Sequence, residues 1–219
     1  MNKLFFLYSK VIHKLDDLII KKVKWLSKVR RSKIKNKDFT IISNNCWGGY
    51  VYRYYGLEYN TPTIGGYFFS EDYIRFLKKF DYYLEQEMRI IETKESKWYS
   101  ILKERGEESV VLGKIDDIEY VFLHYKSKEE AIEKWNRRKR RINKKKILFK
   151  FSEMNECTLG LLNEFNNLKL KNKICFVKQP NSKIENNIYY RGYEKEKEIK
   201  FDTYCWRKYI DIHKLINNL

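Results

Sequence analysis

The chain has 219 residues, of which 43% are hydrophobic and 16% aromatic, so it can build one well-buried domain and is not expected to be disordered. Its net charge of +17 is concentrated in two segments, residues 1–37 and 134–146, and the remainder is close to neutral. This distribution predicts two separate anionic contacts on an ordinary globular body, and it argues against nucleic acid as a partner.

The first 30 residues are predicted to form a basic amphipathic helix. Apolar residues recur at steps of three and four, at Leu4, Val11, Ile12, Leu15, Leu18, Ile19, Val23 and Leu26. Lysines fall on another face, at Lys3, Lys10, Lys14, Lys21, Lys24 and Lys28. Phe5, Phe6 and Trp25 add aromatic anchors of the kind that interfacial helices use. We expect this helix to bind an anionic membrane surface, with packing on the domain or on a second copy as the alternative.

Residues 30–37 lack periodicity and resemble a polar linker, so the expected division is a helix and linker over 1–37 and one domain over 38–219. From residue 39 onward, β-rich runs alternate with helical patterns, which predicts an α/β fold of three layers with a mostly parallel sheet and flanking helices. Strands are expected at residues 39–43, 61–69, 88–92, 118–125, 146–151 and 173–178. Helices are expected in a stretch that ends at Gly56 and at residues 70–84, 127–143, 155–170 and 208–217, with 93–117 irregular.

The densest group of reactive side chains follows the first strand, where parallel sheets bind ligands. We expect this loop to line a substrate pocket through Ser43, Asn44, Asn45, Trp47, Gly48, Gly49 and Tyr50. Glycines let backbone N–H groups approach an oxyanion, and a thiol at a helix N-terminus is favoured as the thiolate, so Cys46 is a candidate nucleophile. The alternatives are an inert small thiol and a tight turn.

His124 ends the strand-like run IEYVFLHY and is a candidate general base for Cys46 or for a substrate hydroxyl. A structural histidine is the alternative. Asp117 begins the approach to the same strand and is a candidate for orienting His124, although Asp116 and Asp117 could equally cap a turn. No Cys and His spacing typical of zinc occurs, so no metal site is expected, and no cofactor can be named.

The second basic segment ends the helix expected at 127–143. Arg137, Arg138 and Arg141 are spaced so that pairs of guanidinium groups share a face and could bind a phosphate. A solvated helix end that complements the helix dipole is the alternative. The four cysteines, Cys46, Cys157, Cys175 and Cys205, are widely spaced, and no secretory leader or membrane span is recognisable, which predicts reduced thiols in the cytoplasm.

Several segments resemble a bacterial family known as domain of unknown function 1919, among them FTIISNNCWGG, DYIRFLKKFDYYL, GKIDDIEYVFLHYKSKEEAIEKW and RRINKKKILF. The resemblance covers about residues 38–180. It implies a role in exopolysaccharide or capsule biosynthesis but supplies no catalytic residues. We expect a transferase, with acyl transfer favoured, that acts on a phosphorylated or nucleotide- or lipid-linked sugar at the inner face of the cell membrane. A glycosyltransferase and a non-catalytic sugar- or carrier-binding accessory protein are the alternatives.

Overall fold

A computed structural model describes residues 3–180 and 183–219 of the chain, with side chains described from Phe6 onward except that of Lys21. The predicted α/β fold is confirmed. Its central sheet is parallel, with the strand order β1-β6-β7-β8. The strands are β1 (Thr40–Ser43), β6 (Ile147–Ser152), β7 (Lys173–Val177) and β8 (Asn187–Tyr189).

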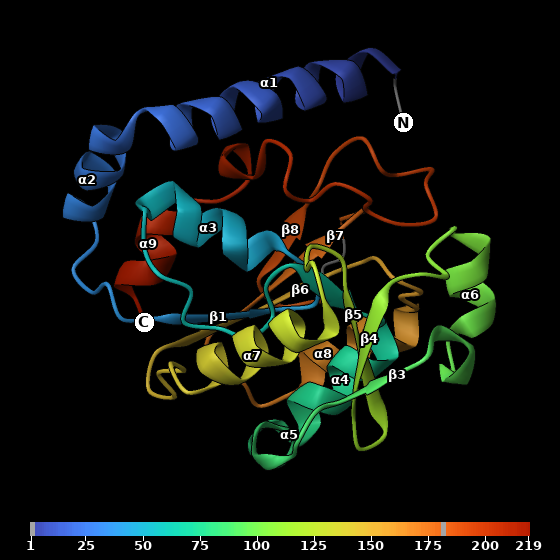
Figure 1. The fold of residues 1–219 in the computed structure, drawn as a ribbon. Helices are drawn as coiled ribbons and strands as arrows, with labels where there is room; N and C mark the ends of the chain where they lie inside the picture. Colours follow the sequence, from blue (N-terminus) through green and yellow to red (C-terminus); the bar gives the residue numbers. More distant parts are fainter. Residues whose placement is uncertain (1–2, 181–182) are drawn as a thin grey trace.

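Helices cover both faces of this sheet, which gives the three expected layers (Figure 1). On one face lie α3 (Trp47–Tyr55) and α9 (Ile212–Asn217). On the other face lie α4 (Ser70–Lys78), α7 (Lys128–Lys139) and α8 (Leu159–Asn167). Side chains of a strand alternate between these layers: Ile41 packs in the cluster with α3, whereas Ile42 packs in the cluster with α4 and α8.

A second, antiparallel sheet has the strand order β2-β5-β4-β3. Its strands are β2 (Gly66–Phe68), β3 (Arg89–Ile91), β4 (Val111–Ile115) and β5 (Ile118–Phe122). Three of the strands expected from the sequence therefore belong to this sheet and not to the parallel one. The backbone N–H of Phe68 donates to the carbonyl of Asn44 over 3.0 Å, which joins the second sheet to the end of β1.

The expectation that residues 93–117 are irregular is wrong. This region contains the 3-10 helix η1 (Thr93–Glu95), the helix α6 (Tyr99–Glu104) and the strand β4. Gly113 hides the strand pattern, because a Cβ at this position would lie 2.5 Å from the Met88 sulfur and 2.8 Å from the Phe122 ring. Close packing at this position of β4 therefore requires glycine, a residue whose presence in the sequence usually indicates a turn and not a strand.

Other boundaries also differ from the sequence expectation. The helix expected at 70–84 is interrupted at Lys79, whose φ of −127° and ψ of 46° are not helical, so α5 (Phe80–Glu85) is separate from α4. The strand β8 was not expected. The final helix begins at Ile212, capped by Asp211, and is preceded by the 3-10 helix η2 (Trp206–Lys208).

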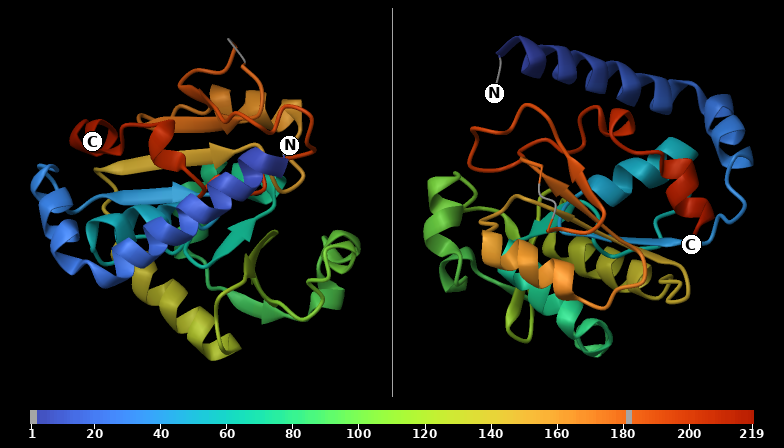
Figure 2. Two further views of the ribbon diagram at one scale, coloured as in Figure 1. Left: turned by 90° about the horizontal axis from the view of Figure 1, so that it is seen from above. Right: turned by 180° about the vertical axis from the view of Figure 1, so that it is seen from behind.

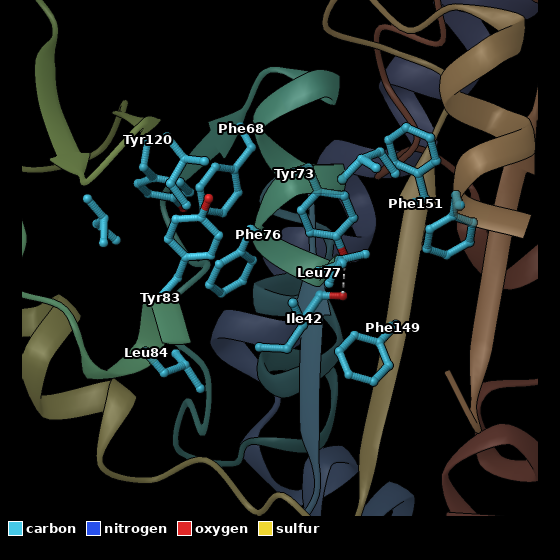
Figure 3. Close-up of a cluster of buried hydrophobic side chains, with 14 of the residues drawn as sticks. Ile42, Phe68, Tyr73, Phe76, Leu77, Tyr83, Leu84, Tyr120, Phe149 and Phe151 are labelled. Atoms are coloured by element: carbon cyan, nitrogen blue, oxygen red, sulfur yellow. Dashed lines mark hydrogen bonds between the residues drawn. The ribbon is translucent and has the colours of Figure 1, made fainter. Parts of the chain in front are cut away.

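The two sheets share a core rich in aromatic residues (Figure 3). Within it the Tyr73 hydroxyl lies 2.9 Å from the carbonyl oxygen of Ile42 and 2.9 Å from that of Lys150. Helix α4 is thereby attached to the neighbouring strands β1 and β6. The candidate site lies where these two strands end.

The N-terminal segment forms two helices, α1 (Lys3–Lys22) and α2 (Lys24–Ser32). Seen from above, α1 crosses over the molecule on the side of α3 (Figure 2, left). Part of the expected linker is structured, because residues 30–32 belong to α2 and Ile34 is buried in the core. In residues 3–180 and 183–219, no helix is long and apolar enough to cross a bilayer.

Candidate functional site

Two neighbouring cavities open where β1 and β6 end. One, the arginine cavity, has a volume of about 300 Å³ and is lined by Arg53, Lys134 and Arg138 together with tyrosine side chains. The other, the mixed-charge cavity, has a volume of about 420 Å³. Its charged lining residues are Arg105, Glu107, Glu198, Lys200 and Asp202. Its position at the carboxyl ends of parallel strands is where sheets of this class bind ligands.

Cys46, Tyr50 and His124 line both cavities and therefore lie where the two meet. All three residues were expected in the site from the sequence. Their proximity depends on β2: the Cys46 thiol donates to the Gly66 carbonyl over 3.3 Å, and the backbone N–H of His124 donates to the Gly65 carbonyl over 3.1 Å. Both residues are thus fixed to the same two-residue segment.

Only glycine fits this segment. Gly65 has a φ of +78°, a conformation that other residues rarely adopt. A Cβ on Gly66 would lie 2.1 Å from the carbonyl oxygen of Val121. The close pairing of β2 with β5 that results is what brings His124 to the loop that follows β1.

The surroundings of Cys46 do not favour a thiolate. Burial is the main cause, and it raises the pKa of the Cys46 thiol to about 11. No hydrogen bond joins this thiol to the His124 ring, which is exposed to solvent. A deprotonated thiol at neutral pH, which a nucleophilic role requires, is therefore not supported.

A buried network of charged and polar side chains forms the floor of the mixed-charge cavity. Lys150 pairs with Asp202, and their side chains are 0% and 2% exposed. The Asn45 amide nitrogen donates to both Asp202 oxygens over 2.9 Å, and the Ser152 hydroxyl donates to one of them over 2.5 Å. Burial lowers the pKa of Lys150, while the Asp202 carboxylate opposes this shift. Asp202 was not predicted as a site residue.

The rest of the expected loop is structural. The Asn44 side chain bridges to the backbone of Ser152 in both directions, over 3.0 and 3.1 Å, and the Ser43 hydroxyl donates to the Asn45 carbonyl over 2.6 Å. Trp47 is fully buried, and the Lys150 ammonium lies 5.8 Å from its ring centroid. These three residues hold the loop and do not line the cavities.

The Gly49 N–H is not free to bind an oxyanion. It donates to the Cys46 carbonyl over 3.0 Å, three residues earlier, at the start of α3. A Cβ on Gly48 would lie 3.2 Å from Ile41, and one on Gly49 would lie 3.2 Å from Ile64. These glycines therefore allow α3 to pack closely, although Gly49 also borders the arginine cavity.

The three predicted arginines are separated. Arg138 is 8% exposed, lines the arginine cavity and donates to the Tyr125 hydroxyl over 2.8 Å. Arg137 instead forms an exposed ion pair with Glu133 over 2.8 Å. Arg141 lies beyond the end of α7 and pairs with Glu58 over 3.5 Å. These three arginines therefore do not form a shared phosphate-binding site. Of the three, Arg138 alone lines the arginine cavity.

Asp117 does not reach His124. It lies in the turn before β5, whereas His124 follows the other end of that strand. Tyr83 donates to its carboxylate over 2.6 Å and Arg75 over 2.9 Å, and these bonds lower the pKa of Asp117. The alternative reading of Asp117 as a turn residue describes what is observed.

The SNNCWGG loop and the strand that ends at His124 are thus parts of one site, and both lie inside the region matched by a known family. The model described as domain of unknown function DUF1919 matches residues 19–218. The chain belongs to this family. An uncharacterized protein of Haemophilus influenzae is 27% identical over 191 residues, which cover 85% of this chain and 86% of that protein.

The family match extends beyond the expected residues 38–180. It includes the last part of α1, all of α2 and the loop that carries Asp202. Among the described side chains, no three His, Cys, Asp or Glu residues are grouped as a metal site would require. Arg53 and Asp202, which sequence reasoning missed, carry no local motif that could have indicated them.

Proposed function

We propose that this protein is a transferase that moves a group from a phosphate-bearing donor to a hydroxyl of a sugar, in the synthesis of a bacterial surface polysaccharide at the cytoplasmic face of the membrane. One observation carries the proposal: a cationic cavity and a carboxylate-bearing cavity meet at Cys46, Tyr50 and His124. Such a pair suits two substrates of different charge. The four free cysteines agree with a reducing compartment.

The donor fits the arginine cavity. Arg138 is nearly buried there, which strengthens its attraction for a phosphate oxygen relative to a solvated arginine. Arg53 lines the same cavity and lies over the ring of Tyr50, 4.3 Å from its centroid, and Tyr50 also borders the second cavity. Arg53 pairs with Asp17 and Lys134 pairs with Glu130, whereas none of the ion pairs among the described residues involves Arg138. Arg138 is therefore the cation that a nucleotide or a lipid diphosphate would neutralise.

The acceptor fits the mixed-charge cavity. Carboxylates accept hydrogen bonds from sugar hydroxyls, and Glu107, Glu198 and Asp202 border this space. Phe201 supplies an apolar surface for the C–H face of a sugar ring. Asp202 is 2% exposed and already accepts hydrogen bonds from Lys150, Asn45 and Ser152. The half-buried Glu107 and Glu198 are therefore the carboxylates that a sugar hydroxyl would reach.

His124 is the proposed base. Its imidazole takes the proton from the acceptor hydroxyl, the oxygen forms a bond to the transferred carbon, and the bond from that carbon to the donor breaks with its electron pair leaving on the donor. We favour direct acyl transfer to the hydroxyl, because the protonated Cys46 thiol does not support a covalent relay. The carboxylates of the mixed-charge cavity favour a glycosyltransferase as the second candidate.

Ligand-dependent unfolding temperatures of the full chain test the proposal. Coenzyme A thioesters, nucleotide sugars and polyprenyl phosphates would be compared, and at 100 times the dissociation constant one class should raise the midpoint by roughly 5 °C. Arg138→Gln should abolish the shift, whereas Arg137→Gln, its exposed neighbour on α7, should retain it. The proposal fails if no ligand class raises the unfolding midpoint of the wild type, or if the two variants show the same ligand-dependent shift.

A further inference from the structure

The helix α1 presents an apolar face to solvent. Leu7, Val11, Leu15 and Leu18 follow one another at steps of four and three, and their exposed fractions are 59%, 48%, 50% and 50%. Exposed apolar side chains in such a continuous row mark an interaction site. We call this row the outer stripe of α1.

The opposite face of α1 holds the helix to the domain. Phe6 packs on Phe201 with ring centroids 5.3 Å apart, and His13 stacks on Tyr204 at 4.4 Å. Phe6 was expected to be a membrane anchor, but it faces inward. At 100° per residue these contacts lie about half a turn from the outer stripe, so the fold attaches α1 without using its most apolar side.

Charge indicates what the outer stripe contacts. Lys10 and Lys14 lie next to the stripe on the helix surface and are exposed. The acidic residues of α1 point to the domain instead, where Asp16 pairs with Arg207 and Asp17 pairs with Arg53 over 2.9 Å. The solvent side of α1 is therefore apolar and cationic.

We infer that the outer stripe of α1 docks on an anionic lipid bilayer, with α1 lying in the plane of the interface. Apolar side chains would enter the acyl boundary while Lys10 and Lys14 meet anionic headgroups. Trp25 and Val29, which lie one turn apart on α2, are also exposed apolar side chains, at 62% and 45%. This inference concerns the surface alone and does not depend on what the cavities bind.

Vesicle flotation with the full chain tests it. The wild type should float with vesicles that contain phosphatidylglycerol and not with vesicles of phosphatidylcholine alone. Changing Leu15→Glu and Leu18→Glu together should weaken binding at least tenfold. Leu159→Glu is the matched control, because Leu159 of α8 is an equally exposed leucine, at 64%, on another part of the molecule and should leave binding unchanged.

A second pair of variants tests the charge separately. Lys10→Gln with Lys14→Gln should weaken binding and reduce its salt dependence, whereas Lys145→Gln with Lys171→Gln, two exposed lysines outside α1, should do neither. Equal binding to neutral vesicles, or equal loss in the control variants, would overturn the inference. A dimer in sedimentation equilibrium that the Leu15 and Leu18 changes dissociate would also overturn it and assign the stripe to a second copy.

Discussion

Lys150 and Asp202 form an ion pair that is buried from solvent. The pair joins β6 of the parallel sheet to the loop that lines the mixed-charge cavity. Asp202→Asn would leave the lysine charge buried without its partner. We expect a loss of about 3–5 kcal/mol in the free energy of unfolding, measured by urea denaturation. Asp81→Asn, which breaks the exposed pair with Lys144, should cost less than about 1 kcal/mol.

The pH dependence of Asp202→Asn follows from the same pair. Burial lowers the pKa of Lys150, so in the variant the unfolded chain binds more protons than the folded chain at pH values below the ordinary lysine pKa. Its stability should therefore rise as the pH increases from about 7 to 9. A flat difference between variant and wild type over this range would show that Lys150 stays charged in the folded variant, because the folded and unfolded chains would then bind the same number of protons.

Cys46 should react slowly with alkylating reagents. Its pKa of about 11 lies two units above the ordinary value of 9.0, so at pH 8 the thiolate fraction is roughly 100-fold smaller than in a solvated cysteine. Iodoacetamide labelling followed by mass spectrometry would measure this, with the same peptide in urea as the reference. Fast labelling at pH 7 would restore Cys46 as a candidate nucleophile.

His124→Gln should separate binding from turnover. Under the proposed function the base is lost while both cavities stay intact, so kcat should fall by roughly 10²–10⁴ with little change in ligand affinity. His213→Gln is a suitable control, because His213 lies between Tyr54 and Tyr55, away from both cavities. Unchanged turnover in His124→Gln would favour the glycosyltransferase, whereas a wild type that binds ligand without turnover would favour the non-catalytic accessory protein.

Tyr73→Phe should weaken the attachment of α4 to the parallel sheet. It removes the hydroxyl that reaches the carbonyl oxygens of Ile42 and Lys150 and leaves these buried acceptors without that donor, at a cost of about 1–3 kcal/mol. Tyr82→Phe removes an exposed hydroxyl that contacts Asp116 and should cost much less. Equal urea midpoints for the two variants would contradict the assigned role of Tyr73.

Local patterns were enough to predict the α/β class, most of the strands and the loop after β1 as part of the site. Strand alternation and helix caps act over a few residues, as in the capping of α7 by Ser127, so they are visible in the sequence. The position of Cys46 at the carboxyl end of a parallel strand follows from the same rule. His124 was expected near Cys46 by the same rule, but in the structure it follows the antiparallel strand β5 and is held there by its N–H bond to the Gly65 carbonyl.

Tertiary structure alone decided the rest. Asp202 meets Lys150 across 52 residues of chain, and no local pattern indicates which loop will cover a strand. The second sheet forms by pairing between segments that contain glycine, a residue that in the sequence indicates turns. Which face of α1 points to the domain depends on the stacking of its aromatic side chains on the rings of residues 201–204. Local propensity does not distinguish between alternative ways of pairing and packing these segments. The choice depends on the free energy of burial, and that free energy comes from contacts between residues distant in sequence.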